Sequence, residues 1–444
     1  MSARTIYFIG IGGIGMSAIA RYYLQCGERV HGYDLVRTAI TEQLEADGAQ
    51  IHYEEDVRQI PQDVDFVVYT PAIPQQHAEM VYFREHGIAM YKRSQVLGML
   101  AKGHPTLAVA GTHGKTTTTA MLAQLLAPYR NLMAFIGGIA KNFNSNFLIC
   151  KDFDTVVVEA DEFDRSFLTL FPTIAIITSM DADHLDIYGD RAHLVESFQL
   201  FADQIEDGGQ LIIHENIAEQ IKHPRKLTYG EGADCDFRIS GIQLGLNRAE
   251  FTLSFKGKRY ADIELGVSGY HNVLNGAAAF AAALLSGLSE EEIRQQMRGF
   301  SGVKRRFDYR IERDDFVYID DYAHHPEEIR AIVTAVRKIY ADKELTVVFQ
   351  PHLYTRTRDF ATQFAEVLSM ADNIILLDIY PAREEPIPGI TSEYLLNLIT
   401  KKEKKLLSKA ELIPYLRTHK PEVLLTIGAG NIDRLVAPIE EAFR

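Results

Sequence analysis

A lysine within a glycine-rich loop is the clearest sign of chemistry in the sequence. The segment LAVAGTHGKTTTTAML places Gly114, Lys115 and Thr116 between a strand-like run and a helix-like run. The spacing departs from Gly-x-x-x-x-Gly-Lys-Ser/Thr because Val109 stands where the first glycine would be. Backbone amides of such a loop can still surround phosphates, the lysine can reach β- and γ-phosphate oxygens, and the threonine can bind Mg²⁺. A structural turn is the alternative. The residues predicted to form this phosphate site are Gly111, Thr112, His113, Gly114, Lys115, Thr116 and Thr117.

Carboxylates follow two strand-like runs in the same part of the chain. TVVVEADEFD ends on Glu159 and three further acids, and IAIITSMDADHLD ends on His184 among aspartates. At the carboxyl ends of parallel strands these groups would face the phosphate loop. Oxygen ligands with one imidazole suit Mg²⁺ or Mn²⁺ better than zinc. The alternative is a solvated acidic loop for the first cluster and an incidental histidine for the second. The acids concerned are Glu159, Asp161, Glu162, Asp164, Asp181, Asp183 and Asp186.

A second glycine loop lies near the start of the chain, in IYFIGIGGIGMSAIA. Its Gly-x-Gly-x-x-Gly spacing lets backbone amides approach a diphosphate at a helix N-terminus. Asp34 ends the next strand-like run, where a carboxylate can meet a ribose hydroxyl. NAD, FAD and a UDP-sugar all carry a diphosphate, so the motif alone leaves the nucleotide open, with NAD the first candidate. The predicted contacts are Gly10, Gly12, Gly13, Ile14, Gly15 and Asp34.

Polar clusters in the last third of the chain could serve a substrate. Asn272 and Asn275 in YHNVLNGAAAF can bind an adenine edge, although N-capping by Asn272 is the alternative. Arg305 in GVKRRFD stands near a presumed domain boundary and can neutralise phosphate charge, with a surface position as the alternative. DDYAHHPEEI and QPHLYTRTRDF each follow a strand-like run, and arginine forks suit a carboxylate or a phosphate. The two clusters contain Asp320, Asp321, Tyr322, His324, His325, His352, Tyr354, Arg356 and Arg358.

Strand-like and helix-like runs alternate along the whole chain, which predicts an α/β fold with parallel sheets covered on both faces. Residues 237–267 instead alternate apolar and polar side chains, which indicates antiparallel strands. The lysine-rich stretch 401–409 is expected to be a solvated helix. Strands are predicted at 5–9, 66–69, 106–110, 155–160, 173–178, 316–319, 345–349, 374–377 and 423–427.

Length and composition exclude several classes of protein. The chain of 444 residues is long enough for about three domains. A net charge of −14 argues against a general nucleic-acid or membrane binder, because both need basic surface. Three widely spaced cysteines argue against a disulfide framework and a zinc site. The start of the chain runs directly into a strand pattern and the longest apolar run, 277–285, is too short to cross a bilayer, so we expect a soluble cytoplasmic protein.

Taken together, these motifs resemble the Mur ligase family over essentially the whole chain. GTHGKTTT is highly specific for such ligases, and EADEFD, DADHLD, YHNVLN, DDYAHHP and QPHLYTRT resemble the branch that acts on UDP-N-acetylmuramate and L-alanine. The resemblance implies that the first glycine loop holds UDP rather than NAD. It implies three domains: a Rossmann-like UDP-sugar-binding domain at 1–103, a central P-loop-type ATPase domain with a small antiparallel part at 104–307, and a Rossmann-like amino-acid-binding domain at 308–444.

The activity that the resemblance implies is ATP-dependent ligation of L-alanine to the lactyl carboxylate of UDP-N-acetylmuramate through an acyl phosphate, in cytoplasmic peptidoglycan precursor synthesis. ATP with Mg²⁺ or Mn²⁺, the UDP-sugar and L-alanine would be its small-molecule partners. No nucleic acid or membrane is expected, and the chain would be a monomer or a homodimer. The alternatives are a recycling ligase that adds a preformed stem peptide to the same sugar, an NAD-dependent oxidoreductase, and a nucleotide-binding regulatory protein without catalysis.

Residue roles follow from the same resemblance, motif by motif. Lys115 would contact the ATP phosphates, and His324 is the candidate to accept a proton from the incoming amine. Leu353 stands where the family often has an arginine, and no lysine lies between Lys151 and Lys222, so a carbamylated metal-bridging lysine is excluded. The implied metal ligands are Thr116, Glu159 and His184, the implied ATP contacts Asn272, Asn275 and Arg305, and the implied substrate face Tyr322, His324, His352 and Arg356; Lys115, Glu159, His184 and His324 would be catalytic.

Overall fold

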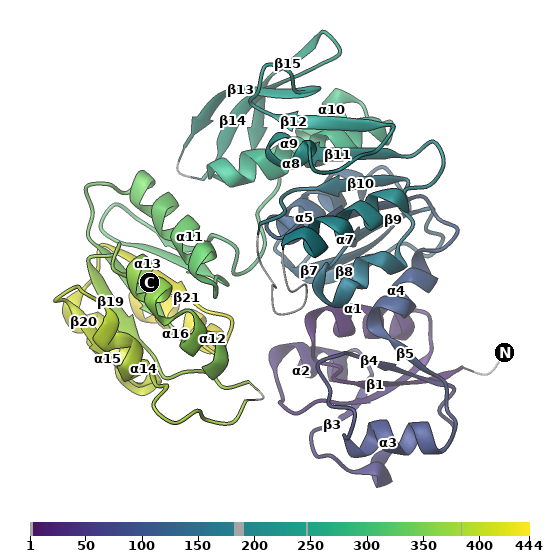
Figure 1. The fold of residues 1–444 in the computed structure, drawn as a ribbon, viewed down its shortest axis with the longest axis horizontal. Helices are drawn as coiled ribbons and strands as arrows, with labels where there is room; N and C mark the ends of the chain where they lie inside the picture. The colour runs from purple at the N-terminus through teal and green to yellow at the C-terminus, as the bar shows by residue number, and fades with distance from the viewer. Residues whose placement is uncertain (1–2, 182–190, 246, 383) are drawn as a thin grey trace. The chain divides into compact units, whose positions relative to one another are not determined.

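The computed structural model of the chain describes residues 3–181, 191–245, 247–382 and 384–444. The chain divides into two compact units, Met1–Val303 and Lys304–Arg444. Within the described residues the strands form three sheets, two in the first unit and one in the second, and helices cover both faces of each parallel region (Figure 1). The predicted α/β fold class is confirmed. No helix in the described part of the chain is long and apolar enough to cross a membrane.

The first sheet has the strand order β3-β2-β1-β4-β5, and all of its strands are parallel. β1 is buried along its whole length, as its apolar sequence TIYFI predicts for a central strand. Its Gly-rich end leads into α1, so the predicted strand–loop–helix context of the first glycine loop is present. The elements are β1 (Thr5–Ile9), α1 (Ile14–Gln25), β2 (Arg29–Tyr33), α2 (Ala39–Ala46), β3 (Gln50–His52), η1 (Val57–Gln59), β4 (Phe66–Tyr69), α3 (Ala78–Glu85), β5 (Met90–Lys92) and α4 (Arg93–Ala101).

A buried carboxyl group on α3 makes the stability of this part of the molecule depend on pH. Glu79 is fully buried, and the Tyr7 hydroxyl donates a hydrogen bond to it at 2.9 Å. Burial raises the pKa of Glu79 from 4.5 to about 7. The folded protein therefore holds this proton more tightly than the unfolded chain does, so the stabilisation is complete below pH 4.5 and is lost as pH rises through 7.

Replacing Glu79 by glutamine removes this titration and keeps a hydrogen-bond acceptor for Tyr7. From pH 5 to pH 8, the free energy of unfolding of the unmodified protein should fall by about 2 kcal/mol more than that of Glu79→Gln. Urea denaturation at the two pH values measures the difference. Glu85→Gln, at the exposed end of the same helix, is the control. Equal pH dependence of the Glu79 variant and the unmodified protein would contradict the expectation.

The central sheet has ten strands in the order β15-β14-β13-β12-β11-β10-β6-β9-β7-β8. The predicted antiparallel part is confirmed, because β13, β14 and β15 pair antiparallel at one edge. The β7–β8 hairpin at the other edge is also antiparallel and was not predicted. The strands are β6 (Thr106–Ala110), β7 (Leu132–Ala140), β8 (Ser145–Ile149), β9 (Thr155–Glu159), β10 (Ile174–Ile177), β11 (Gln210–His214), β12 (Lys226–Gly230), β13 (Phe237–Leu244), β14 (Ala249–Phe255) and β15 (Lys258–Leu265).

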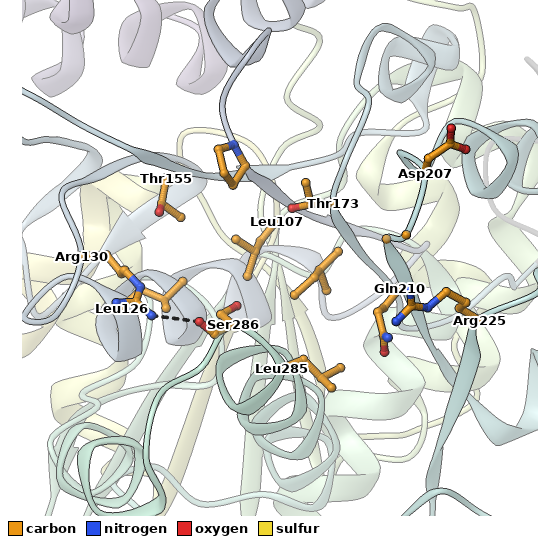
Figure 2. A pocket seen from close by; sticks show the side chains of 14 residues that line it. Leu107, Leu126, Arg130, Thr155, Thr173, Asp207, Gln210, Arg225, Leu285 and Ser286 are labelled. Carbon is orange, nitrogen blue, oxygen red and sulfur yellow. Dashed lines mark hydrogen bonds between the residues drawn. The ribbon is translucent and has the colours of Figure 1, made fainter.

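A cavity of about 520 Å³ lies at the amino ends of the central strands (Figure 2). Thr155, Ile174 and Gln210 line it at the first residues of β9, β10 and β11. Arg130 lies at its side and donates a hydrogen bond to the carbonyl oxygen of Ser286 at 2.9 Å. Ligands of parallel α/β sheets bind at the opposite, carboxyl ends of the strands, so this cavity is not the predicted nucleotide site.

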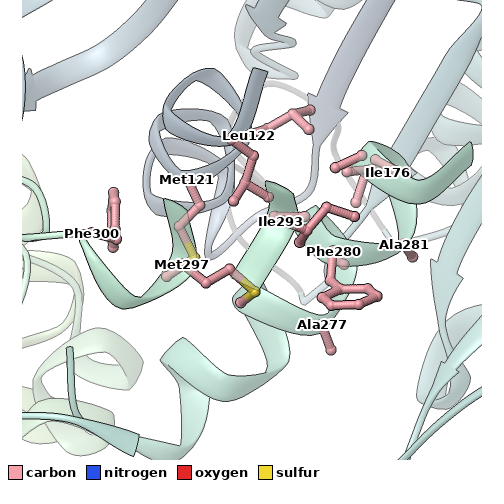
Figure 3. Close-up of a cluster of buried hydrophobic side chains, with 14 of the residues drawn as sticks. Met121, Leu122, Ile176, Ala277, Phe280, Ala281, Ile293, Met297 and Phe300 are labelled. Carbon is pink, nitrogen blue, oxygen red and sulfur yellow. The ribbon is translucent and has the colours of Figure 1, made fainter. Parts of the chain in front are cut away.

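Helices on one face of the central sheet build the core that holds its phosphate loop. Met121 and Leu122 of α5 lie among Phe280, Ile293 and Met297 from α9 and α10 (Figure 3). The Ala-rich sequence of α9 lets it approach α5 closely, and its residues 277–283 are all buried. The helices are α5 (Lys115–Leu126), η2 (Phe163–Thr169), α7 (Arg191–Asp203), α8 (Glu215–Ala218), α9 (Tyr270–Leu285) and α10 (Glu290–Arg298).

The second unit contains a six-stranded sheet in the order β16-β17-β21-β18-β19-β20, in which only β16 is antiparallel. Its strands are β16 (Asp308–Glu312), β17 (Val317–Asp321), β18 (Leu345–Phe349), β19 (Asn373–Leu376), β20 (Lys404–Leu406) and β21 (Val423–Ile427). Its helices are α11 (Pro326–Ile339), α12 (Tyr354–Asp359), α13 (Ala361–Leu368), α14 (Ser392–Leu398), α15 (Lys409–His419) and α16 (Asp433–Phe443).

The helix expected over 401–409 is wrong. This stretch contains the edge strand β20, and edge strands favour lysine because its charge discourages further pairing. Lys404 also donates hydrogen bonds from Nζ to the carbonyl oxygens of Leu396 and Ile399, at 2.9 and 2.6 Å, at the end of α14. The following helix begins only at Lys409, where Ser408 and Glu411 form a capping box.

Candidate active site

The loop between β6 and α5 has the geometry of a phosphate-binding loop. Gly111 and Gly114 have φ angles of +131° and +82°, which a residue with a side chain adopts only with strain. Gly114 is the N-cap of α5 and offers no side chain to its first amides, so they stay available to an anion. A Cβ atom on Gly114 would lie 2.5 Å from Oδ1 of Asn275, because this asparagine packs directly against the loop.

Residues after the neighbouring strand β10 hold the loop in shape. The Ser179 hydroxyl oxygen accepts a hydrogen bond from the backbone N–H of His113 at 2.8 Å, and the Ser179 carbonyl accepts one from Thr112 at 3.1 Å. The Thr178 hydroxyl donates to the carbonyl oxygen of His113 at 2.5 Å. Neither of these two side chains was predicted from the sequence. The only sequence feature that could have indicated them is their position directly after the strand that pairs with β6.

Lys115 is held by a buried carboxylate. Its Nζ donates to the carbonyl oxygen of Gly111 at 2.6 Å and to Oε1 of Glu162 at 2.9 Å. Glu162 is fully buried. Burial opposes the charge of Lys115, but Glu162, followed by Asp161 and Glu159, holds the pKa of its ammonium above the usual value. The sequence suggested Glu162 as one of several metal ligands. In the structure it instead pairs with the lysine of the phosphate loop.

Two of the candidate metal ligands lie side by side. The Thr116 hydroxyl donates a hydrogen bond to Oε1 of Glu159 at 3.1 Å, and the backbone N–H of Gly137 donates to Oε2 at 2.8 Å. His184 lies outside the described residues, as do Asp183 and Asp186. Within the described ranges no group of three or more His, Cys, Asp or Glu side chains could hold a metal ion.

Both asparagines of the YHNVLN motif are buried on the first turns of α9, beside the phosphate loop. The helix N-cap is Gly269, so the alternative that Asn272 caps the helix is wrong. Asn272 instead donates from Nδ2 to the carbonyl oxygen of Ser268 at 2.6 Å. Of the two, Asn275 is the one that touches the loop, at Gly114.

The first glycine loop presents an open helix N-terminus in the same unit. Gly13 is the N-cap of α1 and forms no side-chain cap. The backbone N–H of Gly12 donates to Oδ2 of Asp34 at 2.7 Å, which places the predicted ribose-binding carboxylate directly at the loop. Gly10 has a φ angle of +86°. Asn146 of β8 donates from Nδ2 to the carbonyl oxygen of Ile14 at 2.6 Å, so the central sheet supports this loop.

The predicted substrate-face residues gather at the carboxyl ends of the third sheet. The His324 ring centre lies 5.2 Å from that of Tyr322 and 6.1 Å from that of His352. Burial lowers the pKa of His324, Arg356 lowers it further, and Glu328 opposes both. Nη1 of Arg356 is buried and has no hydrogen-bond partner within the described part of the chain. The cluster thus combines a neutral imidazole with a buried guanidinium nitrogen that could bind a ligand.

Arg305 lies at the same end of this sheet. Its Nε donates to Oδ2 of Asp320 at 3.1 Å, its Nη2 donates to the carbonyl oxygen of Gly428, and its guanidinium carbon lies 5.2 Å from the Tyr322 ring centre. Burial raises the pKa of Asp320 to about 6, although Arg305 favours its charged form. Asp321 is also buried and accepts a hydrogen bond from the backbone N–H of Phe307 at 2.7 Å. The two aspartates therefore hold the start of the unit in place.

Comparison with known proteins identifies the family. The family models "Mur ligase family, catalytic domain", "Mur ligase middle domain" and "Mur ligase, glutamate ligase domain" match residues 5–105, 109–283 and 305–430. The chain belongs to the Mur ligase family. The family resemblance seen in the sequence motifs is thereby confirmed.

This Mur ligase is similar over its full length to proteins named UDP-N-acetylmuramate–L-alanine ligase. The protein from Parabacteroides distasonis is 48% identical over 446 residues, covering 98% of this chain and 96% of that protein. The one from Cytophaga hutchinsonii is 45% identical, with coverages of 98% and 96%. Among solved structures, UDP-N-acetylmuramate-alanine ligase MurC from Thermotoga maritima matches with a TM-score of 0.83, 27% identity and 99% coverage of both chains. A murein peptide ligase from Psychrobacter arcticus shares the fold, with a TM-score of 0.72, 24% identity and coverages of 99% and 98%.

One further cation of this Mur ligase contacts the first glycine loop and the acidic turn after β9, and it was not predicted. Arg93, the first residue of α4, packs against Gly15 and pairs with Asp161 at 3.3 Å between Nη2 and Oδ2. Nothing in the sequence around Arg93 has a nucleotide-binding spacing. Its position follows only from the packing of α4 beside η2, where the Thr169 hydroxyl donates to the carbonyl oxygen of Ser94 at 2.8 Å.

Proposed function

We propose that this Mur ligase joins L-alanine to the lactyl carboxylate of UDP-N-acetylmuramate and converts ATP to ADP and phosphate. The observation that carries the proposal is the full-length identity of 45–48% to relatives that bear this activity in their names. Membership of a ligase family argues against the NAD-dependent oxidoreductase and against a purely regulatory nucleotide-binding protein. ATP and nucleotide sugars are cytoplasmic metabolites, so we place the reaction in the cytoplasm.

The reaction requires activation of a carboxylate. A carboxylate is a poor electrophile because its leaving group would be oxide. Transfer of the γ-phosphoryl group of ATP to a carboxylate oxygen forms an acyl phosphate, from which phosphate leaves readily. The neutral amine of L-alanine then attacks the carbonyl carbon and the amide forms. Positioning and charge neutralisation provide most of the catalysis of such a transfer.

We assign the ATP site to the loop at Gly111–Thr117 and the UDP-sugar site to the loop at Gly10–Gly15 with Asp34. Lys115 would move from Glu162 towards the β- and γ-phosphates, and the amides at the start of α5 would bind phosphate oxygens. Asn272, Asn275 and Arg305 are proposed as further ATP contacts. We propose domains at 1–103, 104–307 and 308–444, and the family models support them by matching residues 5–105, 109–283 and 305–430.

Mg²⁺, or Mn²⁺ in its place, is proposed to bind at Thr116 and Glu159. A hydroxyl and a carboxylate with oxygens 3.1 Å apart are hard donors of the kind that these ions prefer. When bound, the ion supplies positive charge that neutralises the phosphates during transfer. His184 stays a predicted third ligand outside the described residues.

Replacing Gly137 by alanine should disturb this metal site without replacing either proposed ligand. The added Cβ atom would lie 2.3 Å from both carboxylate oxygens of Glu159, so the carboxylate must leave its position beside Thr116. We expect the Mg²⁺ concentration for half-maximal phosphate release to rise about tenfold, with kcat recovering at high Mg²⁺. Gly299→Ala is the control, because a Cβ atom there meets no atom closer than 3.6 Å. An unchanged Mg²⁺ dependence of the Gly137 variant would refute the assignment.

Tyr322, His324, His352 and Arg356 are proposed to bind L-alanine. Nδ1 of His324 lies 3.0 Å from the carbonyl oxygen of Tyr322, which can only accept, so Nδ1 carries the hydrogen and Nε2 keeps its lone pair. The lowered pKa of His324 keeps this imidazole neutral at neutral pH. It can therefore take a proton from the ammonium group of the amino acid.

Phosphate release from ATP tests the proposed function. Reactions would contain Mg²⁺ and UDP-N-acetylmuramate with L-alanine, with other amino acids, or with a stem tripeptide. Release that depends on L-alanine, with a product heavier by one alanyl residue, is the expected result. Release only with the tripeptide would instead assign the recycling reaction, and no release with any acceptor would refute a ligase function.

A further inference from the structure

Arg93 lies directly against the loop assigned to the UDP-sugar diphosphate. A Cβ atom on Gly15 would be 2.9 Å from Nη1 and 3.0 Å from Cδ of Arg93, so this side chain lies on the backbone of the first turn of α1. That turn carries no acidic residue and no side-chain cap. A guanidinium at an open helix N-terminus adds a full positive charge to amides that already favour an anion.

The other side of the same guanidinium contacts the acidic turn after β9. Nη2 of Arg93 lies 3.3 Å from Oδ2 of Asp161, and their side chains are 19% and 37% exposed. The next residue in the chain is Glu162, whose carboxylate lies 2.9 Å from Nζ of Lys115. Two adjacent carboxylates of one turn therefore each bind a cation: Asp161 binds Arg93 of the UDP-sugar site, and Glu162 binds Lys115 of the ATP site.

The acidic turn and α4 form a packed body that can transmit a change between the sites. A Cβ atom on Gly98 of α4 would lie 2.5 Å from the carbonyl oxygen of Thr169, so α4 approaches η2 at backbone distance. η2 begins directly after Glu162. Because Asp161 and Glu162 are consecutive residues, a shift of this turn moves the carboxylate on Arg93 and the carboxylate on Lys115 together.

We propose that Arg93 binds the diphosphate of the nucleotide sugar through its Gly15 side while keeping Asp161, and that the Asp161–Glu162 turn thereby couples this site to Lys115 in the ATP loop. The inference rests on the proposed function, which supplies the two nucleotide ligands. Because the planar guanidinium can bind two partners at once, neither contact must be lost. Each ligand then orders the shared turn for the other, so binding at the two sites is positively cooperative.

Two substitutions separate the direct contact from the coupling. Arg93→Gln removes the cation from the diphosphate and breaks the ion pair with Asp161, so the acidic turn loses its link to the UDP-sugar site. We expect it to weaken UDP binding about tenfold or more and to abolish the coupling. Asp161→Asn leaves the cation at the diphosphate but breaks the link, so UDP affinity should stay within about twofold while the coupling disappears. Arg93→Lys keeps the positive charge but lacks the planar guanidinium that can bind two partners, so it should retain only part of the UDP affinity.

Isothermal titration of the full chain with UDP, with and without saturating Mg²⁺ and ADP, measures both quantities. The unmodified protein should bind UDP about fivefold more tightly when ADP is present, and linkage requires ADP to gain the same factor from UDP. Arg21→Gln is the matched control. Arg21 lies on α1, the helix whose first turn Arg93 contacts, pairs with Asp47 at 2.8 Å and has a side-chain exposure of 16%, but its partner is not in either phosphate site. Thermal melts verify that each variant is folded.

The outcomes distinguish this inference from the proposed function. Coupling that is present in the unmodified protein and the Arg21 variant, and absent in both the Arg93 and Asp161 variants, supports it. Unchanged UDP affinity in the Arg93 variant, equal coupling in the Asp161 variant, or no coupling in the unmodified protein would overturn it and leave the ligase function standing. Failure of the unmodified protein to bind UDP at all would overturn the assigned UDP-sugar site together with the inference.

Discussion

Lys115→Ala is expected to lower ATP-dependent phosphate release by about 10³-fold or more. Lys115 is the cation of the phosphate loop and lies over the carbonyl oxygen of Gly111, within reach of phosphates bound at the start of α5. Without it, no side-chain charge of this loop would offset the charge of the transferred phosphoryl group. Acyl-phosphate formation from UDP-N-acetylmuramate and ATP, trapped with hydroxylamine, measures this step. Normal formation by the variant would refute the role.

The same substitution leaves Glu162 fully buried and without its closest cation, so stability must be separated from chemistry. A buried carboxylate that loses its partner destabilises a protein strongly. The double variant Lys115→Ala/Glu162→Gln removes that charge as well. We expect it to regain much of the thermal stability and none of the phosphate release. Recovery of activity in the double variant would show that the single variant had merely failed to fold.

Arg356→Ala is expected to raise the KM for L-alanine about 10²- to 10³-fold. The Nη1 atom of Arg356 is buried and has no hydrogen-bond partner among the residues that the structure describes. A guanidinium nitrogen kept from water gains most from a charged ligand, and the carboxylate of an amino acid is such a group. Initial rates across a range of L-alanine concentrations measure this KM, and a separate measurement of ATP affinity shows whether the effect is confined to the amino acid.

Arg358 provides a matched control two residues further along the same helix. It is exposed and pairs with Asp359 at 2.7 Å, so Arg358→Ala should leave the KM for L-alanine unchanged. ATP affinity should be unchanged in both variants, because neither arginine is among the proposed ATP contacts. A KM increase of the same size in both variants, or an unaltered KM in Arg356→Ala, would refute the assignment of the amino-acid site.

Local sequence predicted the scaffold of this protein well. Central strands such as β6 and β18 are continuous apolar runs, and their predicted bounds agree with the structure. The glycine loops could be recognised because positive φ angles and open helix N-termini need glycine at fixed spacing. The lysine-rich stretch before α15 was misread, since a solvated helix and a charged edge strand have the same composition and only the pairing with β19 distinguishes them.

The sequence by itself determined the family, the α/β architecture and which side chains can bind phosphates, because these depend on residue type and spacing within short segments. Only the tertiary structure decided which carboxylate each cation contacts. Glu159, Asp161 and Glu162 look equivalent in the sequence, yet they contact Thr116, Arg93 and Lys115. Partners that lie 43, 68 and 47 residues away meet only when β9, α4 and α5 have packed, and no local pattern encodes that pairing.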